Sequence, residues 1–379
     1  MIIRDDWLTN AATQAVFATI GAGGHQALAV GGCVRNALLS APVSDIDIAT
    51  DARPERVTDL AEAAGLRVVP TGLDHGTVTI ISDGLPHEVT TFRRDEETDG
   101  RHAVVAFSGD VAEDAARRDF TMNALYADAA GQVIDPLDGL ADLRARHVRF
   151  IGDPEARITE DYLRILRFFR FTAWYGDPDR GLDAEGLAAC AALQDGLDRL
   201  SRERVGHEVR KLLSAPDPAP AIAAMARTGI LGRILPGADD TALAPLIHIA
   251  PETDWIARLA LLGGAVEGMR LSKQEERLLH DLATAARDGT APFALGYDLG
   301  PRGAQAVAIR ATLMGQAVDA GDLEMAAKGA DAVFPLQAAD LMPDLSGPAL
   351  GEALARARAV WLARDGDISK ADLIAAAKG

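Results

Sequence analysis

The residues best suited to chemistry are two aspartates one residue apart, Asp45 and Asp47, in the apolar segment 45 to 50. Alternate side chains of a strand share one face, so both carboxylates are predicted to point the same way while Ile46 and Ile48 enter the core. Neighbouring carboxylates repel each other unless a hard cation lies between them, and Mg²⁺ prefers oxygen ligands together with substrate phosphates. Two such ions about 3.5 to 4 Å apart activate an attacking hydroxyl and stabilise a leaving pyrophosphate. The pair therefore indicates metal-dependent phosphoryl transfer.

A glycine pair and an arginine precede the aspartates. The apolar run 28 to 30 leads into Gly31-Gly32, where the missing Cβ atoms let backbone N–H groups approach phosphate oxygens. A helix that starts near Val34 would add its positive end, and Arg35 in its first turn suits a bidentate phosphate contact. Gly32 and Arg35 are therefore predicted to bind a nucleotide. The alternative is a solvated strand face after an ordinary turn, which the strand-glycine-helix-strand order makes the weaker interpretation.

A third carboxylate is expected on a neighbouring strand. Glu88 is the best placed, because it lies in the alternating segment 87 to 92. The alternative is that Glu88 is an exposed strand residue with no part in the chemistry.

The elements that must position these residues follow from the hydrophobic pattern. Up to about residue 150, short apolar runs alternate with turn residues, which is typical of an α/β or α+β domain. Strands are predicted at 28 to 30, 45 to 50, 76 to 82, 87 to 92 and 132 to 136, and helices at 8 to 20, 34 to 40, 54 to 65 and 117 to 127. After 152 to 154, Ala/Leu-rich helical segments are expected to the end of the chain, with the clearest break at 215 to 220.

Composition narrows the class of protein. A chain of 379 residues that is 48% hydrophobic suggests two to four units with an ample core. The net charge of −18 argues against avid nonspecific binding of polyanions but allows a local basic groove. Cys33 and Cys190 lack metal-ligand spacing, which favours a reducing compartment. The sequence has neither a signal-peptide pattern nor an apolar run of about 18 residues, so a cytoplasmic protein with no membrane contact is expected.

Five motifs in one order over residues 30 to 215 resemble the class II nucleotidyltransferases, which include bacterial CCA-adding enzymes and poly(A) polymerases. The segments are GGCVRNALLSAPVSDID, ARRDFTMNALY, DPLDGLADL, EDYLRILRFFRF and LSRERVGHEVRKLL, which begin at residues 31, 116, 135, 160 and 200. Three positions depart from the pattern: Asn36 stands where Asp is usual, Ser40 where Gly is common and Ala103 where Pro is usual. None of them is an expected metal ligand, so activity is still predicted.

The resemblance implies the architecture. It implies an α+β fold in which a DNA-polymerase-β-like nucleotidyltransferase head, a mixed sheet with flanking helices, precedes an all-α neck, body and tail. The expected domains are a catalytic head at 1 to 150, a helical neck that recognises the base at 151 to 215, a helical body at 216 to 290 and a helical, tRNA-binding tail at 291 to 379. No obligate protein partner is expected.

The segment 116 to 126 resembles the family's sugar- and phosphate-contacting motif. Arg117 and Arg118 suit triphosphate oxygens, while Asp119 and Asn123, four residues apart on the predicted helix, can hold a ribose hydroxyl or fix an arginine. The resemblance implies that Arg118 contacts the nucleotide and Asp119 supports its sugar. The alternative is a salt-bridged start of a helix.

Four charged residues recur every third position on a helix predicted over 160 to 171: Asp161, Arg164, Arg167 and Arg170. A carboxylate accepts from the exocyclic amino group of C or A but not from U or G at the same position, and an adjacent guanidinium donates to ring acceptors. Asp161 with Arg164 is therefore predicted to act as a protein template for CTP and ATP. The resemblance implies that Arg167 and Arg170 also line the nucleotide pocket, and the alternative is an amphipathic helix with a solvated basic side.

These features predict attack by an RNA 3′ hydroxyl on the α-phosphate of CTP or ATP, with two Mg²⁺ ions held by Asp45 and Asp47 and with Glu88 assisting. The charge-dense segment 93 to 106 resembles the family's flexible loop for switching from C to A addition, and the helical remainder is expected to grip tRNA. The alternatives are a poly(A) polymerase, a partial-activity CC- or A-adding enzyme, a transferase for small molecules or proteins, and a silent RNA-binding protein. The acidic chain and the base-reading helix favour CCA addition to the tRNA 3′ end.

Overall fold

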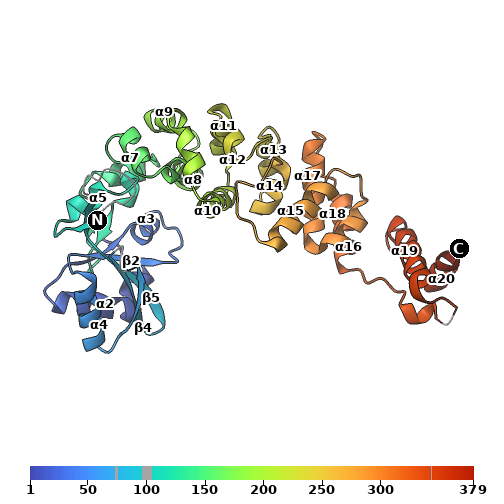
Figure 1. Ribbon diagram of the computed structural model, residues 1–379, viewed down its shortest axis with the longest axis horizontal. Coiled ribbons are helices and arrows are strands. Elements are labelled where there is room, and N and C mark those ends of the chain that lie inside the picture. The colour runs from blue at the N-terminus through green and yellow to red at the C-terminus, as the bar shows by residue number, and fades with distance from the viewer. Residues whose placement is uncertain (73–75, 96–104, 343) are drawn as a thin grey trace. The chain divides into compact units, whose positions relative to one another are not determined.

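The computed structural model describes residues 1–72, 76–95, 105–342 and 344–379, and the chain divides into two compact units, Met1–Gly196 and Leu197–Gly379 (Figure 1). The first unit combines a mixed sheet with helices, whereas the described part of the second is helical. This confirms the predicted order of a mixed head and an all-α region. The division into four domains stays a prediction.

A mixed sheet forms the centre of the first unit. In the described part of the chain it has seven strands in the order β3-β4-β5-β2-β1-β8-β9. β2 runs parallel to β5, whereas the other neighbouring strands are antiparallel. The strands are β1 (Ala27–Val30), β2 (Ile46–Thr50), β3 (Arg67–Gly72), β4 (Thr77–Ser82), β5 (Leu85–Thr91), β8 (Tyr126–Ala127) and β9 (Val133–Ile134). Beside it, β6 (Arg93–Asp95) pairs with β7 (Val105–Phe107).

One face of the sheet is covered by α2 (Ala11–Ala22) and α4 (Pro54–Ala63), which pack on its strands (Figure 1). On that face Ile48 is fully buried, and His87 Nε2 lies 3.0 Å from the hydroxyl of Thr13 on α2. Side chains alternate along each strand, so the neighbours of Ile48 and His87 point to the other face. Core packing on one face thereby fixes which residues of β2 and β5 the opposite face presents.

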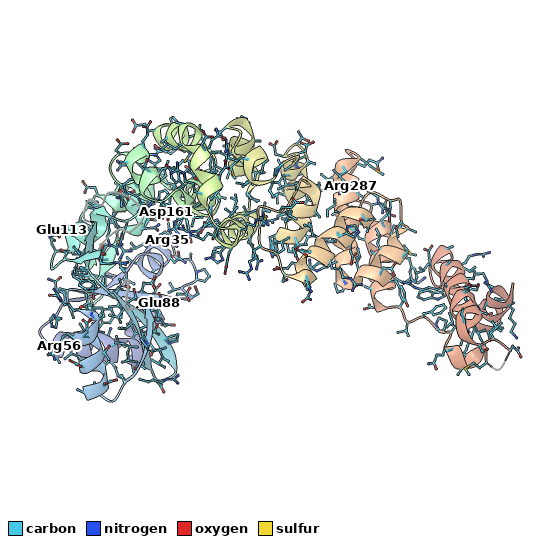
Figure 2. The ribbon with its side chains drawn as sticks, in the orientation of Figure 1. Arg35, Arg56, Glu88, Glu113, Asp161 and Arg287 are labelled. Atoms are coloured by element: carbon cyan, nitrogen blue, oxygen red, sulfur yellow. The ribbon has the colours of Figure 1, made fainter. Side chains whose placement is uncertain are left out.

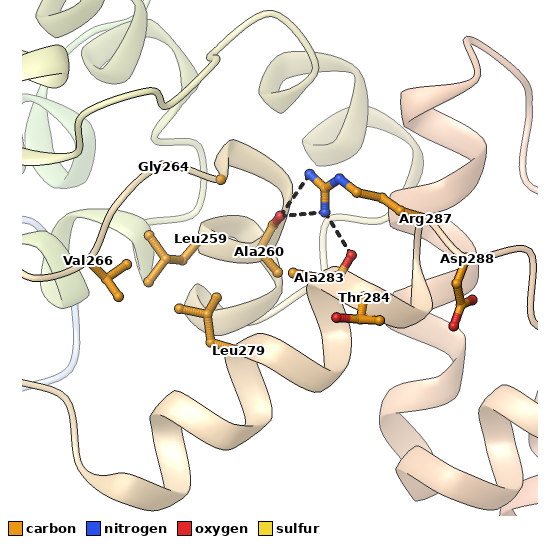
Figure 3. A pocket seen from close by; sticks show the side chains of 10 residues that line it. Leu259, Ala260, Gly264, Val266, Leu279, Ala283, Thr284, Arg287 and Asp288 are labelled. Carbon is orange, nitrogen blue, oxygen red and sulfur yellow. Dashed lines mark hydrogen bonds between the residues drawn. The ribbon is translucent and has the colours of Figure 1, made fainter.

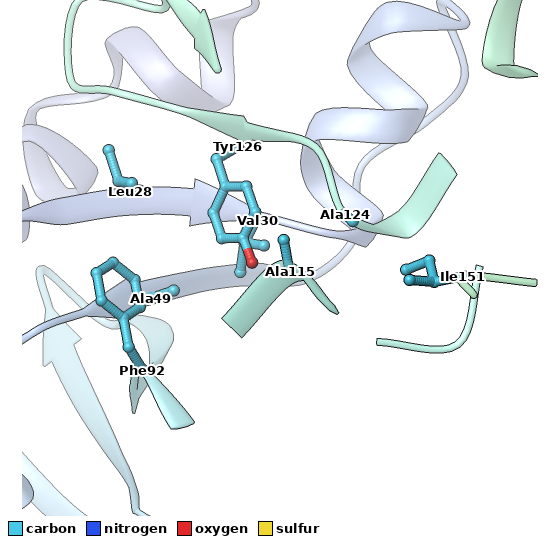
Figure 4. Close-up of a cluster of buried hydrophobic side chains, with 8 residues drawn as sticks. All are labelled: Leu28, Val30, Ala49, Phe92, Ala115, Ala124, Tyr126 and Ile151. Carbon is cyan, nitrogen blue, oxygen red and sulfur yellow. The ribbon is translucent and has the colours of Figure 1, made fainter. Parts of the chain in front are cut away.

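Toward β1 and β8, a hydrophobic cluster covers that opposite face (Figure 4). Its buried members are Leu28, Val30, Ala49, Phe92, Ala115, Ala124, Tyr126 and Ile151. The Tyr126 hydroxyl donates a 2.8 Å hydrogen bond to Asp114 on α5 (Val111–Ala116). The cluster holds the segment after α5 against the end of β1, where α3 (Gly32–Leu38) begins.

The predicted helix at 117 to 127 is wrong. α5 ends at Ala116, a 3₁₀ turn follows at Thr121–Asn123, and β8 begins at Tyr126. Phe120 forms an isolated bridge with Phe150, and the amide of Phe120 donates to the carboxylate of Asp119 at 2.8 Å. Such local side-chain-to-backbone bonds compete with helix formation, and here the extended Phe120 gains a buried aromatic neighbour in Phe150, 4.9 Å away. The other predicted strands and helices of the head are present with shifted ends, whereas β3, β6, β7 and β8 were not predicted.

Among its described residues the first unit also contains α1 (Asp6–Thr9), α6 (Gly139–Arg144), α7 (Pro154–Glu160), α8 (Leu163–Tyr175) and α9 (Ala184–Ala192). The helix predicted over 160 to 171 starts two residues later than its charged pattern, because Asp161 adopts extended backbone angles between α7 and α8. α8 is anchored by aromatic rings: Phe168 and Phe171 lie 6.4 and 5.1 Å from Phe120. The buried rings join α8 to the irregular segment after α5.

The second unit is built from short helices, as expected. They are α10 (Arg202–Leu213), α11 (Ala219–Arg227), α12 (Ile230–Ile234), α13 (Leu243–Ile249), α14 (Trp255–Leu262), α15 (Lys273–Ala285), α16 (Pro292–Leu299), α17 (Gly303–Leu313), α18 (Ala320–Asp331), α19 (Gly347–Ala363) and α20 (Lys370–Lys378). The proline-rich break at 215 to 220 falls between α10 and the first turn of α11, as predicted. Trp361 packs edge-on against Phe293 at 5.2 Å near the end of the chain.

α14 and α15 line an apolar cavity of about 560 Å³ in this unit (Figure 3). Arg287 closes one side of it by donating to the carbonyls of Ala260 and Ala283, at 3.3 and 2.9 Å. Across the described residues, no helix is long and apolar enough to cross a membrane. Both cysteines, Cys33 and Cys190, are buried free thiols.

Candidate active site

The two aspartates lie at the start of β2, on the face that α2 and α4 leave uncovered. Asp45 directly precedes the strand and is exposed, and the Ser44 hydroxyl donates to its carboxylate at 2.9 Å. Asp47 is half-buried, and Ile46 and Ile48 on either side are 6% and 0% exposed. The predicted alternation of carboxylates and core side chains is therefore confirmed.

Glu88 stands beside Asp47 on the neighbouring strand. β2 and β5 are parallel, and their register pairs Asp47 with Glu88, so both side chains share one face. Burial, the charge of Glu88 and the charge of Asp45 raise the pKa of Asp47 to about 6, although Arg118 acts in the opposite direction. The structure thus brings the three predicted carboxylates to one strand edge, where their mutual repulsion favours a bound cation.

The donor set around this edge suits a hard cation. Cys33 lies behind Asp47, but its thiol is buried and directed at the carbonyl of Val30, 3.4 Å away, and burial raises its pKa to about 11. Oxygen atoms are therefore the available ligands, as Mg²⁺ requires. In the parts of the chain that the structure describes, no three acidic, histidine or cysteine side chains converge into a complete metal site. Asp45 and Asp47 would hold Mg²⁺ together with water and substrate phosphates.

A glycine turn and an arginine border the carboxylates. Gly31 has φ 72°, a conformation that residues with a side chain rarely adopt, so a substitution there would be strained, and Arg118 Nη1 lies close to this turn. Arg118 Nη2 donates to Asp114 at 3.0 Å and its Nε donates to Tyr126 at 3.1 Å. These bonds fix the guanidinium with Nη1 toward the Gly31 turn, next to the first amides of α3. A phosphate contact by Arg118 and Gly32 stays a prediction.

Arg35 is placed differently from its predicted role. Its guanidinium is 6% exposed and donates to the side chains of Asn36, Asn123 and Tyr175, at 2.9, 2.5 and 2.7 Å (Figure 2). It also lies 4.0 Å above the ring of Tyr175. Most of its donors are used within the protein, where they join α3 to α8. A phosphate contact by Arg35 stays a prediction, and neither Tyr175 nor Asn123 was expected as its partner.

Asp119 connects the segment after α5 to α8. Its carboxylate accepts from Asn123 Nδ2 at 2.9 Å and forms an ion pair with Arg167, whose Nε is 2.8 Å away. Burial alone would raise the pKa of Asp119, but Arg167 and the hydrogen bonds from Asn123 and Phe120 hold it below its usual value. Of the two predicted possibilities, Asp119 here fixes an arginine. A contact with a ribose stays a prediction.

The main chain at Arg117 and Arg118 is held by arginines of the following helices. Arg157 on α7 donates through Nη2 to the carbonyls of both residues, at 2.9 Å for Arg118. Arg164 on α8 donates to the carbonyl of Arg117 at 3.2 Å and to that of Arg157 at 2.7 Å. Sequence reasoning missed Arg157, because a lone arginine before an acidic pair carries no signal for a contact 39 residues away. The proposed base-reading and phosphate-binding segments are therefore hydrogen-bonded to each other.

The remaining predicted residues lie along α8. Asp161 is half-buried at the start of the helix and accepts from the amide of Leu163 at 3.1 Å (Figure 2). Arg170, two turns further on, stacks 4.4 Å above the ring of Phe171. Of the segment resembling the flexible loop, residues 96 to 104 lie outside the described residues, Ala103 among them. Its described ends pair as β6 and β7.

Two family profiles match the chain. The profile of the Poly A polymerase head domain matches residues 27–149, and that of the probable RNA and SrmB-binding site of polymerase A matches residues 181–241. The chain is 39% identical over 217 residues to the CCA-adding enzyme of Anoxybacillus flavithermus. It is 41% identical over 190 residues to the mitochondrial CCA tRNA nucleotidyltransferase 1 of Homo sapiens.

These alignments cover 57% and 50% of this chain but 53% and 44% of the relatives, so the chain spans about half the length of the relatives it matches. The fold is similar over a greater length. The Bacillus stearothermophilus CCA-adding enzyme in complex with CTP superimposes with a TM-score of 0.73 at 25% identity, over 97% of this chain and 96% of that one.

The electrostatics of Asp47 predict how the protein responds to Mg²⁺. The pKa of Asp47 is about 6 in the folded protein and about 3.9 in the unfolded chain. The folded state therefore favours the protonated carboxyl, and the free energy of unfolding falls as the pH rises from about 4 to 6. Asp47→Asn removes the buried charge. At pH 8 in EDTA its free energy of unfolding should exceed that of the wild type by about 2 kcal/mol, and the difference should vanish near pH 4.

The control is Asp59→Asn, an exposed carboxylate on α4. Thermal unfolding at pH 8 should also show that added MgCl₂ raises the Tm of the wild type and of the control but not that of Asp47→Asn. The assignment of Asp47 as a cation ligand would be contradicted if MgCl₂ did not raise the Tm of the wild type. It would also be contradicted if Asp47→Asn were less stable than the wild type at pH 8 in EDTA.

Proposed function

We propose that the chain, which belongs to the class II nucleotidyltransferase family, adds C, C and A to the 3′ end of tRNA from CTP and ATP, releasing pyrophosphate. The observation that carries the proposal is the pairing of Asp47 with Glu88 on an uncovered sheet face, beside the Gly31 turn and Arg118. Relatives named as CCA-adding enzymes, and a similar fold that was solved with CTP, support the choice of substrates.

In the proposed reaction the RNA 3′ hydroxyl attacks the α-phosphate, and the bond to pyrophosphate breaks as the new ester forms. Two Mg²⁺ ions held by Asp45 and Asp47 would lower the pKa of the attacking hydroxyl and neutralise charge on the pyrophosphate. Glu88 adds negative charge that strengthens the cation site. Arg118, fixed by Asp114 and Tyr126, meets phosphate oxygens above the Gly31 turn, and the amide of Gly32 adds a donor there.

Base selection is proposed for the start of α8. Asp161 lies there, where its carboxylate accepts from the amide of Leu163, and Arg164 follows within one turn. Because Arg164 also donates to the carbonyl of Arg117, a shift of this arginine on binding a base would move the phosphate-binding segment. This linkage favours a site in which the correct base and the correct phosphate position are recognised together.

RNA binding is proposed for the helices after the head. The exposed Arg202, Arg204 and Lys211 on α10, together with Arg210, are the proposed early contacts to the backbone of tRNA. Arg210 lies 4.6 Å above the ring of Trp255 and 2.9 Å from Glu275, so it is already ordered. The match to an RNA-binding profile at 181–241 supports this placement. The four-domain division and a cytoplasmic location, which the free buried cysteines favour, belong to the same proposal.

The proposal is tested with tRNA transcripts that end before CCA, after C and after CC. Each is incubated with labelled CTP or ATP and MgCl₂, beside an oligo(A) primer, and the products are resolved by length. The expected result is addition of the missing nucleotides and a stop after the terminal A. A long ladder of A on either primer would support poly(A) synthesis, and an arrest after CC would indicate a partial activity; each outcome contradicts full CCA addition.

Asp161→Ala tests the protein template. Loss of the carboxylate removes the acceptor that distinguishes the amino groups of C and A, so the preference for CTP and ATP over UTP and GTP should fall about tenfold or more in kcat/KM. The matched control is Glu155→Ala, an exposed carboxylate on α7, which should keep wild-type selectivity. Unchanged selectivity in Asp161→Ala would remove the template role.

A further inference from the structure

A cavity of about 280 Å³ lies where the C-terminal end of α8 meets the loop between α3 and β2. Asn36, Leu39 and Pro42 line one side, and Trp174, Tyr175 and Arg146 line the other. Among its lining residues none is acidic, although the chain carries a net charge of −18. A neutral to basic hollow with aromatic walls therefore stands in a strongly acidic protein.

One residue of the aromatic wall, Tyr175, is held in place. Tyr175 accepts a 2.7 Å hydrogen bond from Arg35, whose guanidinium also lies 4.0 Å above its ring, and Phe171 packs against it at 5.5 Å. Trp174, the preceding residue on α8, is 41% exposed, which is unusual for so large an apolar side chain. Aromatic rings with an exposed face are surfaces on which unstacked bases bind.

On the cationic side, the backbone of Arg146 is held in place. Arg146 is an exposed residue with φ 49°, a conformation that costs energy for an arginine, and its carbonyl accepts from the amide of Asp177 at 3.0 Å. A guanidinium near an aromatic wall can stack on a base or pair with a phosphate. The volume is sufficient for one base and too small for a folded protein segment.

The cavity is lined by the loop that leads to Asp45 and differs from the proposed base-reading site. Asn36 Nδ2 donates to the carbonyl of Pro42 at 2.7 Å, which fixes this loop three residues before Asp45, the residue that directly precedes β2. Asp161 and Arg164 lie at the opposite end of α8, a helix of 13 residues that is about 20 Å long. One base cannot occupy both places.

We propose that this cavity binds an unpaired base of the RNA acceptor strand, one that precedes the reacting 3′ nucleotide, by stacking it on Trp174 beside Arg146. The inference rests on the proposed function, because it requires an RNA 3′ end at Asp45. It adds a subsite that holds the primer, separate from the site that selects the incoming nucleotide, so the two substrates are bound at opposite ends of α8.

The test compares Trp174→Ala, Trp174→Phe and Ile2→Ala in steady-state addition of CTP to a tRNA transcript that lacks CCA. Ile2 is the control, because it is also an exposed apolar residue, at 54%, and belongs to no proposed binding site. Loss of one stacked base should raise the KM for RNA about tenfold in Trp174→Ala. The KM for CTP should stay unchanged, and Trp174→Phe and the control should remain near the wild type.

A direct readout uses transcripts with 2-aminopurine at each of the last three positions before the missing CCA. Binding to the wild type should quench one position, and Trp174→Ala should abolish that quenching. An unchanged KM for RNA in Trp174→Ala, equal quenching in both proteins, or a rise in the KM for CTP alone would overturn the inference. Failure of the wild type to add any nucleotide would instead contradict the proposed function, so the two failures are distinguishable.

Discussion

The ion pair between Asp119 and Arg167 is the constraint on which the candidate site depends. Asp119 is 7% exposed and lies in a segment without regular secondary structure, so its charge must be paired within the protein. Loss of one partner from such a buried pair costs about 3 to 5 kcal/mol, because the other charge remains desolvated. The pair fixes α8 against the segment after α5, and Asn123, which donates to Asp119, also accepts from Arg35.

Around this anchor, polar contacts reach every part of the proposed site. Arg157 and Arg164 bind the backbone at Arg117, Asp114 orients Arg118, and Arg35 reaches Tyr175. The carboxylates at β2 and β5, in contrast, carry like charges and repel one another. Strand pairing places Glu88 beside Asp47, and the pKa of Asp47 is raised first by its burial and then by the charge of Glu88. A cation that binds at Asp47 is the simplest physical explanation for a buried carboxylate placed next to the charges of Glu88 and Asp45.

Sequence patterns predicted the parts of the fold whose causes are local. The two-residue period of β2 assigned Asp45 and Asp47 to one face, and the position of Glu88 on an alternating strand was enough to expect it nearby. The helix predicted over 117 to 127 was wrong. There the burial of Phe120 against Phe150 and α8, a tertiary effect, outweighs the local helical pattern. The partners of Arg35 could not be predicted for the same reason: Asn123 and Tyr175 are 88 and 140 residues away in the sequence. Contacts between distant segments leave no periodic trace in a sequence.

The central claim is that Asp45 and Asp47 hold the cations required for nucleotide transfer, and single-turnover incorporation of labelled CTP into a tRNA transcript lacking CCA tests it most directly. Asp45→Ala and Asp47→Ala should each remain folded and incorporate no nucleotide at saturating MgCl₂, whereas the exposed control Asp59→Ala should match the wild type. Retained turnover in either aspartate variant would contradict the account.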